Sequence, residues 1–356
     1  MSTRLERLRK KLSEKADSML ITSKVSCRYL TEFDYDDGFV LVTPKRAFLI
    51  TDSRYTEAAR GEANPQFEVV EVKSSFTKTI KDLLLSDASE VIAIEEYDLS
   101  CEKFDAYKRE FEDFKLSYSD RIIPALRQTK DEKEVENIKF AQSITESAFN
   151  HILGNINGQI TEREVALELE HYMRKNGADG IAFDTIAVSG KQSSLPHGVP
   201  RDKKLEKGFL TLDFGARYKG YCSDMTRTVV IGKADEEMKH LYNTVLCAQM
   251  KALEVIGRDE KCKSVDAVAR DIIDASKYCG CFRHSLGHGV GLEIHENPRL
   301  SPSAKEEKLV QGNVVTVEPG IYIEGRYGVR IEDMVYISEN GAVNLTNAPK
   351  NLIEVC

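Results

Sequence analysis

The sequence predicts an α/β protein of two domains. Its 356 residues are enough for two domains, and an apolar fraction of 41% with a charged fraction of 30% is typical of a soluble globular chain. Residues 1–124 alternate short β-branched runs with helical patterns, whereas residues 125–356 combine capped helices with acidic strand pairs. A charged polar stretch after Pro124 places the boundary there.

The first domain is predicted to be an α/β layer without a catalytic cluster. A helix over 4–15 would place Leu5, Leu8 and Leu12 on one face. This domain contains no histidine. Its other predicted elements are strands at 18–22, 38–43, 46–51, 67–72 and 91–95 and helices at 56–63, 78–85 and 101–112.

The second domain is predicted to begin with two capped helices. The capping-box pattern occurs at Thr129 with Glu132 and again at Thr161 with Glu164. The helices would end near His151 and at Gly177, followed by a strand over 181–190, a loop over 195–198 and a helical pair over 235–256 and 264–279.

Charge and composition exclude some classes of binding partner and indicate the cellular compartment of the protein. A net charge of −8 argues against nucleic acid or an anionic membrane as the main partner. The basic segment 4–15 lacks the apolar region of a signal peptide, and no run approaches the ~18 apolar residues of a membrane span. Eight scattered cysteines without a signal peptide indicate reduced thiols. The sequence therefore predicts a cytoplasmic protein.

Four carboxylates and one imidazole form the most informative pattern. Gathered in one dry pocket, four carboxylates would repel and raise each other's pKa, and two divalent cations would balance them. Any one of these acids taken alone could be an ordinary surface residue. That alternative explains the whole set poorly, because all five residues lie in glycine- and β-rich segments. The five are Asp213 in LDFG, Asp224 in YCSDMTRT, His288 in GHGVG, Glu318 in TVEPG and Glu332 in VRIED.

The spacing of these carboxylates predicts two hairpins. The midpoint between Asp213 and Asp224 lies between Tyr218 and Lys219, and a turn there would set the two Cβ atoms roughly 5 Å apart. The midpoint of the two glutamates is Gly325, within a strand, a glycine-containing turn and a second strand. A single bulge would shift either register.

The segment FRHSLGHGVGLEIHENP supplies three histidines. Its alternating glycines argue against a helical zinc motif and permit close approach of the backbone. His288, with glycine on both sides, is therefore chosen as the nitrogen ligand. His284 and His295 are left for hydrogen bonding, and the alternative of an exposed or core histidine suits His284 better than His295.

Three further residues offer polar groups to a substrate. Arg330 is two residues from Glu332, so on one strand it could orient that carboxylate or hold a substrate carboxylate, with a structural salt bridge as an equal alternative. Arg299 is a candidate for a substrate C-terminal carboxylate, or else a solvated loop residue. His197 lies in the loop SLPHGVP; loops often carry function, although a lone loop histidine is usually a surface residue.

The motifs LPHG, LDFG, GYCSDMTRT, HSLGHGVGLEIHENP, TVEPGIY and GVRIED resemble those of the pita-bread metallopeptidases, which include methionine aminopeptidase, aminopeptidase P, prolidase and creatinase. LITDSRYTEAA resembles the strand-turn-RY signature of the creatinase-type N-terminal domain. The resemblance implies such a domain in 1–124 and a pita-bread catalytic domain in 125–356. The two-domain layout favours Xaa-Pro peptidases, and the complete ligand set argues against creatinase activity.

The resemblance also implies a role for each site residue. The implied ligands of a single metal ion are Asp213, His288 and Glu318, and the implied bridging ligands are Asp224 and Glu332. The implied substrate residues are His197, His295 and Arg330, with His284 as a supporting histidine.

We therefore expect a dinuclear-metal peptidase that cleaves before proline in peptides with proline at the second position. Glu318 would act as general base and proton shuttle, His295 would hydrogen-bond the peptide or the developing oxyanion, and His197 would help hold the substrate. The oxygen-rich ligand set favours Mn²⁺, with Co²⁺, Zn²⁺ and Fe²⁺ as alternatives. The resemblance further implies a homodimer.

Several functions remain open at this level. Aminopeptidase P and prolidase share the metal core and carry equal weight; a prolidase needs a cation for the terminal carboxylate, for which Arg299 is the candidate. A methionine aminopeptidase would not need the additional N-terminal domain. A catalytically silent pita-bread binding module would usually have lost metal ligands, whereas all five positions are kept here.

Overall fold

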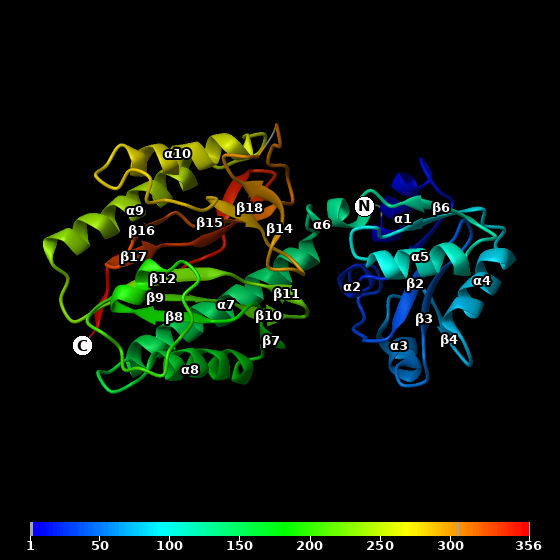
Figure 1. Ribbon diagram of the computed structural model, residues 1–356, viewed down its shortest axis with the longest axis horizontal. Coiled ribbons are helices and arrows are strands. Elements are labelled where there is room, and N and C mark those ends of the chain that lie inside the picture. The colour runs from blue at the N-terminus through cyan, green and yellow to red at the C-terminus, as the bar shows by residue number, and fades with distance from the viewer. Residues whose placement is uncertain (1–2, 305, 356) are drawn as a thin grey trace. The chain divides into compact units, whose positions relative to one another are not determined.

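The computed structural model describes residues 3–304 and 306–355, and the chain divides into two compact units, Met1–Arg127 and Gln128–Cys356 (Figure 1). Pro124 lies inside helix α6 (Ile122–Arg127), which belongs to the first unit. Proline is tolerated there because the first N–H groups of a helix have no intrahelical acceptor. The stretch after Pro124 therefore continues as a helical turn before the second unit begins.

The first unit is built around one mixed sheet of six strands in the order β4-β3-β2-β1-β5-β6. The β1–β2 and β2–β3 pairs are antiparallel, and the other three pairs are parallel. Its strands are β1 (Ser18–Ile21), β2 (Gly38–Val42), β3 (Ala47–Thr51), β4 (Glu68–Glu71), β5 (Val91–Ile94) and β6 (Lys115–Tyr118), and its helices before α6 are α1 (Arg4–Leu12), α2 (Lys24–Thr31), α3 (Thr56–Glu62), α4 (Phe76–Ser86) and α5 (Cys101–Glu110).

The predicted strands and helices of this unit are confirmed, and three short elements were missed. Leu5, Leu8 and Leu12 are buried on one face of α1, as their spacing predicts. The missed elements are β6, α6 and α2. The sequence of α2, KVSCRYLT, has low helix propensity. The two residues that precede this helix are held from a distance, because the Glu95 carboxylate accepts hydrogen bonds from the N–H groups of Thr22 and Ser23 at 2.8 Å.

The second unit places strands between two helical pairs (Figure 1). One pair is α7 (Glu132–Asn155) with α8 (Glu162–Lys175), and the other is α9 (Glu236–Val255) with α10 (Cys262–Asp274). Its strands are β7 (Gly180–Ile181), β8 (Ile186–Ser189), β9 (Gly208–Phe214), β10 (Ala216–Tyr218), β11 (Tyr221–Cys222), β12 (Met225–Ile231), β13 (Gly287–Gly289), β14 (Glu296–Leu300), β15 (Val314–Val317), β16 (Gly320–Ile323), β17 (Tyr327–Arg330), β18 (Asp333–Ser338), β19 (Gly341–Asn344) and β20 (Glu354–Val355), with a 3₁₀ turn at Gly190–Ser194.

Two sheets of this unit position the site. They have the strand orders β20-β12-β9-β8 and β14-β13-β15-β18-β19, and a hairpin of β16 with β17 extends from the second. Each half of the unit thus consists of a helical pair followed by strands, which is the pita-bread architecture that the resemblance implies.

Two local predictions for the second unit need correction. Helix α7 is capped by Asp131 with Glu134, two residues later than predicted, because this pair has the same spacing and forms both bonds of the capping box. The predicted strand over 181–190 is two separate strands in different sheets, β7 and β8. The capping box of Thr161 with Glu164 is confirmed.

The register of the first acidic hairpin differs from the prediction. The turn falls at Lys219 and Gly220, both with positive φ, one residue later than the midpoint requires. Moving a turn by one residue moves the register by two, so Asp213 pairs with Thr226. Asp224 lies two residues before Thr226, and a diagonal neighbour is about 7–8 Å away rather than roughly 5 Å. The predicted direct pairing of the two aspartates is therefore wrong.

The second acidic hairpin has the predicted register. Gly320 pairs with Arg330 and Val317 pairs with Asp333, so the hairpin is centred on Gly325, whose φ is +69°. Glycine adopts this left-handed conformation without steric cost. The same register places Glu318 opposite Glu332 in the gap between the two strand pairs.

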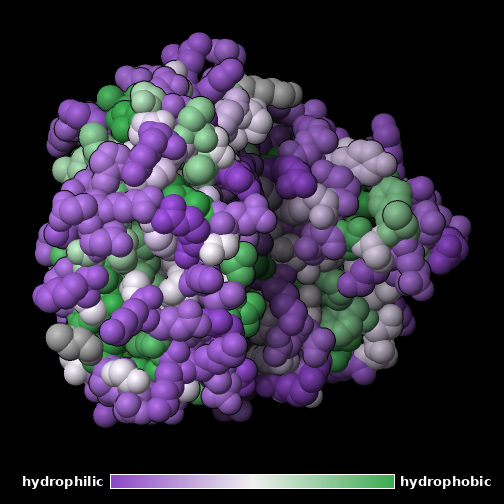
Figure 2. Space-filling view, turned by 60° about the vertical axis from the view of Figure 1, so that its left-hand side comes forward, coloured by the Kyte–Doolittle hydropathy of each residue, from purple (hydrophilic) through white to green (hydrophobic). Residues whose placement is uncertain are grey.

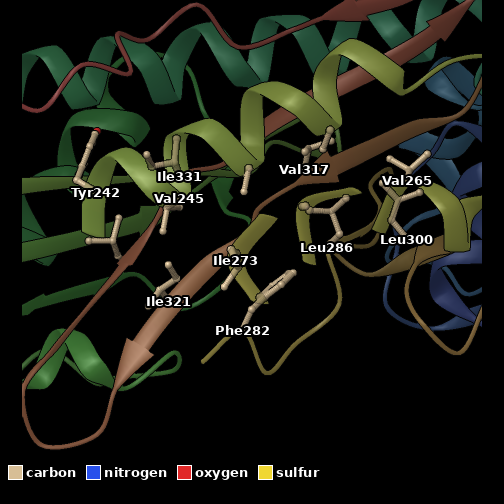
Figure 3. Packing of buried hydrophobic residues seen from close by; sticks show 14 of the residues in the cluster. Tyr242, Val245, Val265, Ile273, Phe282, Leu286, Leu300, Val317, Ile321 and Ile331 are labelled. Atoms are coloured by element: carbon tan, nitrogen blue, oxygen red, sulfur yellow. The ribbon is translucent and has the colours of Figure 1, made fainter. Parts of the chain in front are cut away.

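The hydrophobic core behind this hairpin turns its glutamates away from it. Val317 and Ile331 are fully buried in a cluster that includes α9, α10 and the strands (Figure 3). Successive residues of an extended chain point to opposite faces. Burial of Val317 and Ile331 therefore directs the adjacent Glu318 and Glu332 to the other face.

The visible surface is mostly hydrophilic. Figure 2 shows one face of the molecule, on which hydrophobic residues form small groups among hydrophilic ones. Within the described residues, every helix is too short or too polar to span a membrane. The seven cysteines of the described ranges are free, and Cys356 lies outside these ranges.

Candidate metal centre

All ten residues predicted for the site line one cavity of about 730 Å³ in the second unit. They come from both sheets and from the loops around them. The ten are His197, Asp213, Asp224, His284, His288, His295, Arg299, Glu318, Arg330 and Glu332.

Three of them present ligand atoms close enough for one cation. Asp224, His288 and Glu332 are buried, and one atom from each lies within 4.8 Å of the others. Two carboxylates and an imidazole are a donor set that divalent transition metals accept. Glu318 adds a fourth donor, because its Oε1 lies 3.3 Å from His288 Nε2.

His288 is oriented by its own backbone. Its Nδ1 lies 3.1 Å from the Gly289 carbonyl oxygen, so Nδ1 carries the hydrogen and Nε2 faces the carboxylates. The flanking glycines are required by close packing: a Cβ on Gly287 would lie 1.9 Å from the Thr316 carbonyl oxygen, and one on Gly289 would lie 2.4 Å from the Asn297 carbonyl oxygen. The glycines thus permit β13 to pack against its neighbours.

Two buried carboxylate oxygens have no hydrogen-bond partner among the residues that the structure describes. They are Asp213 Oδ1 and Glu332 Oε1. The second oxygen of each residue is engaged: Asp213 Oδ2 accepts from Arg330 at 2.5 Å, and Glu332 Oε2 accepts from Thr226 at 2.7 Å. An unpaired buried carboxylate oxygen is costly, and a bound cation removes that cost. The residues therefore fit a divalent metal.

The pKa values show how much the carboxylates lack a counter-charge. Burial raises the pKa of Asp213, and burial together with neighbouring carboxylates raises those of Asp224 and Glu332 well above their ordinary values. Burial also opposes ionisation of Glu318, but the hydrogen bond with His288 and the positive charges of His288, His284 and Arg330 together outweigh burial and lower its pKa to about 2. Burial lowers the pKa of His288, yet Glu318 and Asp224 raise it to about 9.

Arg330 contacts Asp213 rather than Glu332. The strand β17 ends at Arg330, so the predicted single strand from Arg330 to Glu332 does not exist. Its Nη2 donates to Asp213, its Nε donates to Thr226 at 3.0 Å, and its Nη1 donates to the Tyr322 hydroxyl at 2.6 Å. With these donors engaged, Arg330 orients a carboxylate of the site.

Thr226 and Tyr322 were not predicted, although both lie within the motifs DMTRT and EPGIY. Their hydroxyls join Arg330 to other site residues, and Tyr322 also contacts His284 Nε2 at 3.1 Å. The sequence carries the residue types, but only the meeting of β12, β16 and β17 reveals these contacts.

The remaining histidines and Arg299 surround the metal ligands. The His295 ring lies edge-on to the His288 ring at 4.4 Å. Burial lowers the pKa of both His284 and His295, which favours their neutral forms. Arg299 pairs with His288 across β13 and β14, which places both side chains on one face of the sheet. His197 and Arg299 are exposed at the cavity.

An apolar wall completes the cavity, and no pattern in the sequence indicated it. Its members come from the segment 183–199, which includes the start of β8, and from a distant loop, and they meet only in the fold. They are Phe183, Ile186, Pro196, Val199 and Ile294.

Known proteins are similar to this chain in sequence and in structure. Residues 136–339 match the model of metallopeptidase family M24, and residues 4–129 match that of the creatinase/prolidase N-terminal domain. A protein of Pyrococcus horikoshii named Xaa-Pro dipeptidase is 40% identical over 342 residues, covering 95% of this chain and 94% of the relative.

Two solved structures extend the similarity to three dimensions. The Xaa-Pro dipeptidase from Bacillus anthracis is 40% identical, with a TM-score of 0.95 over 99% of each chain. The X-Pro aminopeptidase from Thermotoga maritima is 41% identical, with a TM-score of 0.91 over 96% of this chain and 98% of the other. The chain, with its creatinase/prolidase N-terminal domain and its pita-bread domain, therefore belongs to metallopeptidase family M24.

Proposed function

We propose that this chain is an Xaa-Pro dipeptidase that hydrolyses the peptide bond before proline. The observation that carries the proposal is a buried acid-rich cluster in a cavity that also offers an apolar wall and a cationic side chain, Arg299. The full-length similarity to proteins named Xaa-Pro dipeptidase supports it. An Xaa-Pro aminopeptidase is the second candidate, favoured by the Thermotoga maritima structure.

The proposed ligands of two divalent metal ions are Asp213, Asp224, His288, Glu318 and Glu332. Bound there, the ions would lower the pKa of water and polarise the scissile carbonyl. The unpartnered oxygens of Asp213 and Glu332, and the Nε2 of His288 that faces Glu318 and Asp224, support this assignment. Four oxygen donors for one nitrogen donor favour Mn²⁺, with Co²⁺, Zn²⁺ and Fe²⁺ as alternatives.

Glu318 is the proposed general base. Its carboxylate lines the cavity beside His288, where it can accept a proton from the attacking water and pass it to the leaving prolyl nitrogen. Its side chain is only 16% exposed, which limits competition from bulk water.

The neutral histidines are proposed to bind the peptide. A lowered pKa leaves His295 uncharged near pH 7, so one ring nitrogen donates to the substrate carbonyl or the developing oxyanion. His197 is proposed to help hold the peptide from the opposite loop, and His284 to support the site through Tyr322.

Proline itself is proposed to lie against the apolar wall. A prolyl bond offers no N–H, so recognition must use the ring and the termini of the substrate. Phe183 and Ile294 present apolar surface for the ring. Arg299, on the same sheet face as His288, is placed to bind the C-terminal carboxylate of a dipeptide.

The proposal also covers the domain assignment, the oligomeric state and the location of the enzyme. We assign the first unit as the creatinase-type domain and the second unit as the catalytic domain, which moves the boundary predicted after Pro124 to the end of helix α6. A cytoplasmic homodimer is our prediction for the active form.

Hydrolysis of Ala-Pro and Ala-Pro-Ala by metal-stripped protein, with and without Mn²⁺, tests the proposal. Mn²⁺-dependent release of Ala from Ala-Pro alone is expected. Equal or better cleavage of Ala-Pro-Ala would favour the aminopeptidase. Cleavage of neither, with metal bound, would refute a proline-directed peptidase.

The role of Arg299 has its own test. Arg299→Met should lower kcat/KM for Ala-Pro roughly 10- to 100-fold, because a hydrogen bond to a charged group is lost. The same variant should leave Ala-Pro-amide, which has no carboxylate, nearly unchanged. Arg283→Met, an exposed arginine outside the cavity lining, is the matched control.

A further inference from the structure

Two buried threonine hydroxyls each contact a glutamate of the candidate metal centre. Thr226 on β12 and Thr316 on β15 are fully buried. Thr226 Oγ1 lies 2.7 Å from Glu332 Oε2, and Thr316 Oγ1 lies 3.1 Å from Glu318 Oε1. The two glutamates face each other across the second hairpin, so each is approached by a hydroxyl from a different strand.

The direction of the Thr226 hydrogen bond is determined by its other neighbour. Arg330 Nε lies 3.0 Å from Thr226 Oγ1, and a guanidinium can only donate. The hydroxyl must therefore accept from Arg330, which leaves its single hydrogen for Glu332. A hydroxyl that accepts from a cation is a better donor, since hydrogen bonds in a chain polarise one another.

The direction of the Thr316 hydrogen bond is determined in the same way, by a different donor. The backbone N–H of His288 donates to Thr316 Oγ1 at 3.1 Å, so the threonine hydrogen is left for Glu318. Thr316 thereby links the backbone of the nitrogen ligand to the carboxylate of a facing ligand.

We propose that Thr226 and Thr316 are positioning residues that hold Glu332 and Glu318 in their metal-binding orientations. The inference rests on the proposed function, because it takes these two glutamates as ligands. Holding Glu332 by Oε2 leaves Oε1 for a cation, which matches the finding that Oε1 has no hydrogen-bond partner within the described residues. Both threonines act through the carboxylates rather than on the substrate.

Thr228 offers a matched control on the same strand. It is equally buried, donates to the Arg330 carbonyl oxygen at 2.9 Å and accepts from the Arg330 N–H at 3.2 Å. A valine at this position removes the same two kinds of hydrogen bond from buried surroundings, but neither of them involves a carboxylate of the centre.

The test is calorimetric titration of metal-stripped protein with Mn²⁺, which does not depend on activity. Thr226→Val and Thr316→Val should each weaken Mn²⁺ binding about 10- to 100-fold, the usual effect of losing a residue that orients a metal ligand. Thr226→Ser and Thr316→Ser keep the hydroxyl and should bind nearly as the wild type does. Thr228→Val should also bind normally.

The outcomes separate this inference from the proposed function. Wild-type affinity in both valine variants, an equal loss in Thr228→Val, or failure of both serine variants would overturn the positioning role alone. If the wild-type chain binds no Mn²⁺, Co²⁺, Zn²⁺ or Fe²⁺, the metal centre and this inference fail together. If circular dichroism finds a valine variant unfolded, the alanine variant at that position is titrated instead; weakened binding would support the positioning role, and wild-type affinity would overturn it.

Discussion

Replacing Arg227 with methionine should cost the second unit several kcal/mol of stability. The side chain is 1% exposed and pairs with the fully buried Asp333 at 2.8 Å. Arg227 also lies behind the candidate metal centre, because it is adjacent to Thr226. The backbone carbonyls that accept its other hydrogen bonds belong to Thr226, Glu332, Ala348 and Pro349.

The size of the effect follows from these contacts. Removing one partner of a buried ion pair costs about 3–5 kcal/mol, and an unsatisfied buried carbonyl costs about 1–3 kcal/mol. Asp333 keeps Lys350 and Asn344, each at 2.7 Å, which limits the loss. We expect about 4 kcal/mol, against a typical total of about 5–15 kcal/mol. At about 2–4 °C per kcal/mol, Tm should fall by roughly 8–16 °C.

Scanning calorimetry of the intact chain measures this effect. The transition of the second unit is the one that added Mn²⁺ shifts upward, because a ligand stabilises the folded unit that binds it. Arg326→Met is the matched control: Arg326 pairs with Glu237 at 2.9 Å, but both side chains are well exposed, so solvent screens the pair and its loss should change stability little. A loss below about 1 kcal/mol in Arg227→Met, or an equal loss in the control, would refute the reasoning.

Three further predictions concern the metal centre. Glu318→Gln should lower kcat about 10²- to 10⁴-fold at saturating Mn²⁺, as steady-state kinetics on Ala-Pro would measure; wild-type kcat would exclude a general base there. Gly287→Ala should lower Tm, because its Cβ would lie 1.9 Å from a carbonyl oxygen, whereas Gly158→Ala, with open space around the Cβ, should not. In metal-free protein, the carboxylates with raised pKa values stabilise the fold at low pH, and this stabilisation is lost as the pH rises. The stabilisation from protonated His288 is likewise lost as the pH rises toward about 9. The Tm difference between Mn²⁺-loaded and metal-free protein should therefore widen from about pH 5 to about pH 8, and a difference that narrows would contradict this.

Local patterns predicted much of the fold. The spacing of Glu318 and Glu332 about Gly325 predicted the observed register, because a hairpin with a central glycine relates its strands by chain distance alone. The first hairpin shows the limit of this argument. Its turn is located by the positive φ of Lys219 and Gly220, and a shift of one residue there moved Asp213 from Asp224 to Thr226.

One missed element and one unforeseen contact depend on residues that are distant in the chain. Helix α2 has low intrinsic propensity, and the two residues before it are held by Glu95, which lies more than 70 residues away in the chain. Arg330 reaches its carboxylate partner Asp213 only when β17 and β9 meet. Such contacts leave no periodic signal in the sequence.

The sequence by itself determined which donors this protein brings to its site, because residue types in short glycine- and β-rich motifs carry their chemistry with them. All ten predicted residues line one cavity. The tertiary structure decided which atoms of those residues are free. Glu332 Oε1 and Asp213 Oδ1 are left without a partner inside the described ranges because Thr226 and Arg330 engage the other oxygens. These contacts join residues about 100 positions apart, and only packing of the two sheets brings them within hydrogen-bond distance.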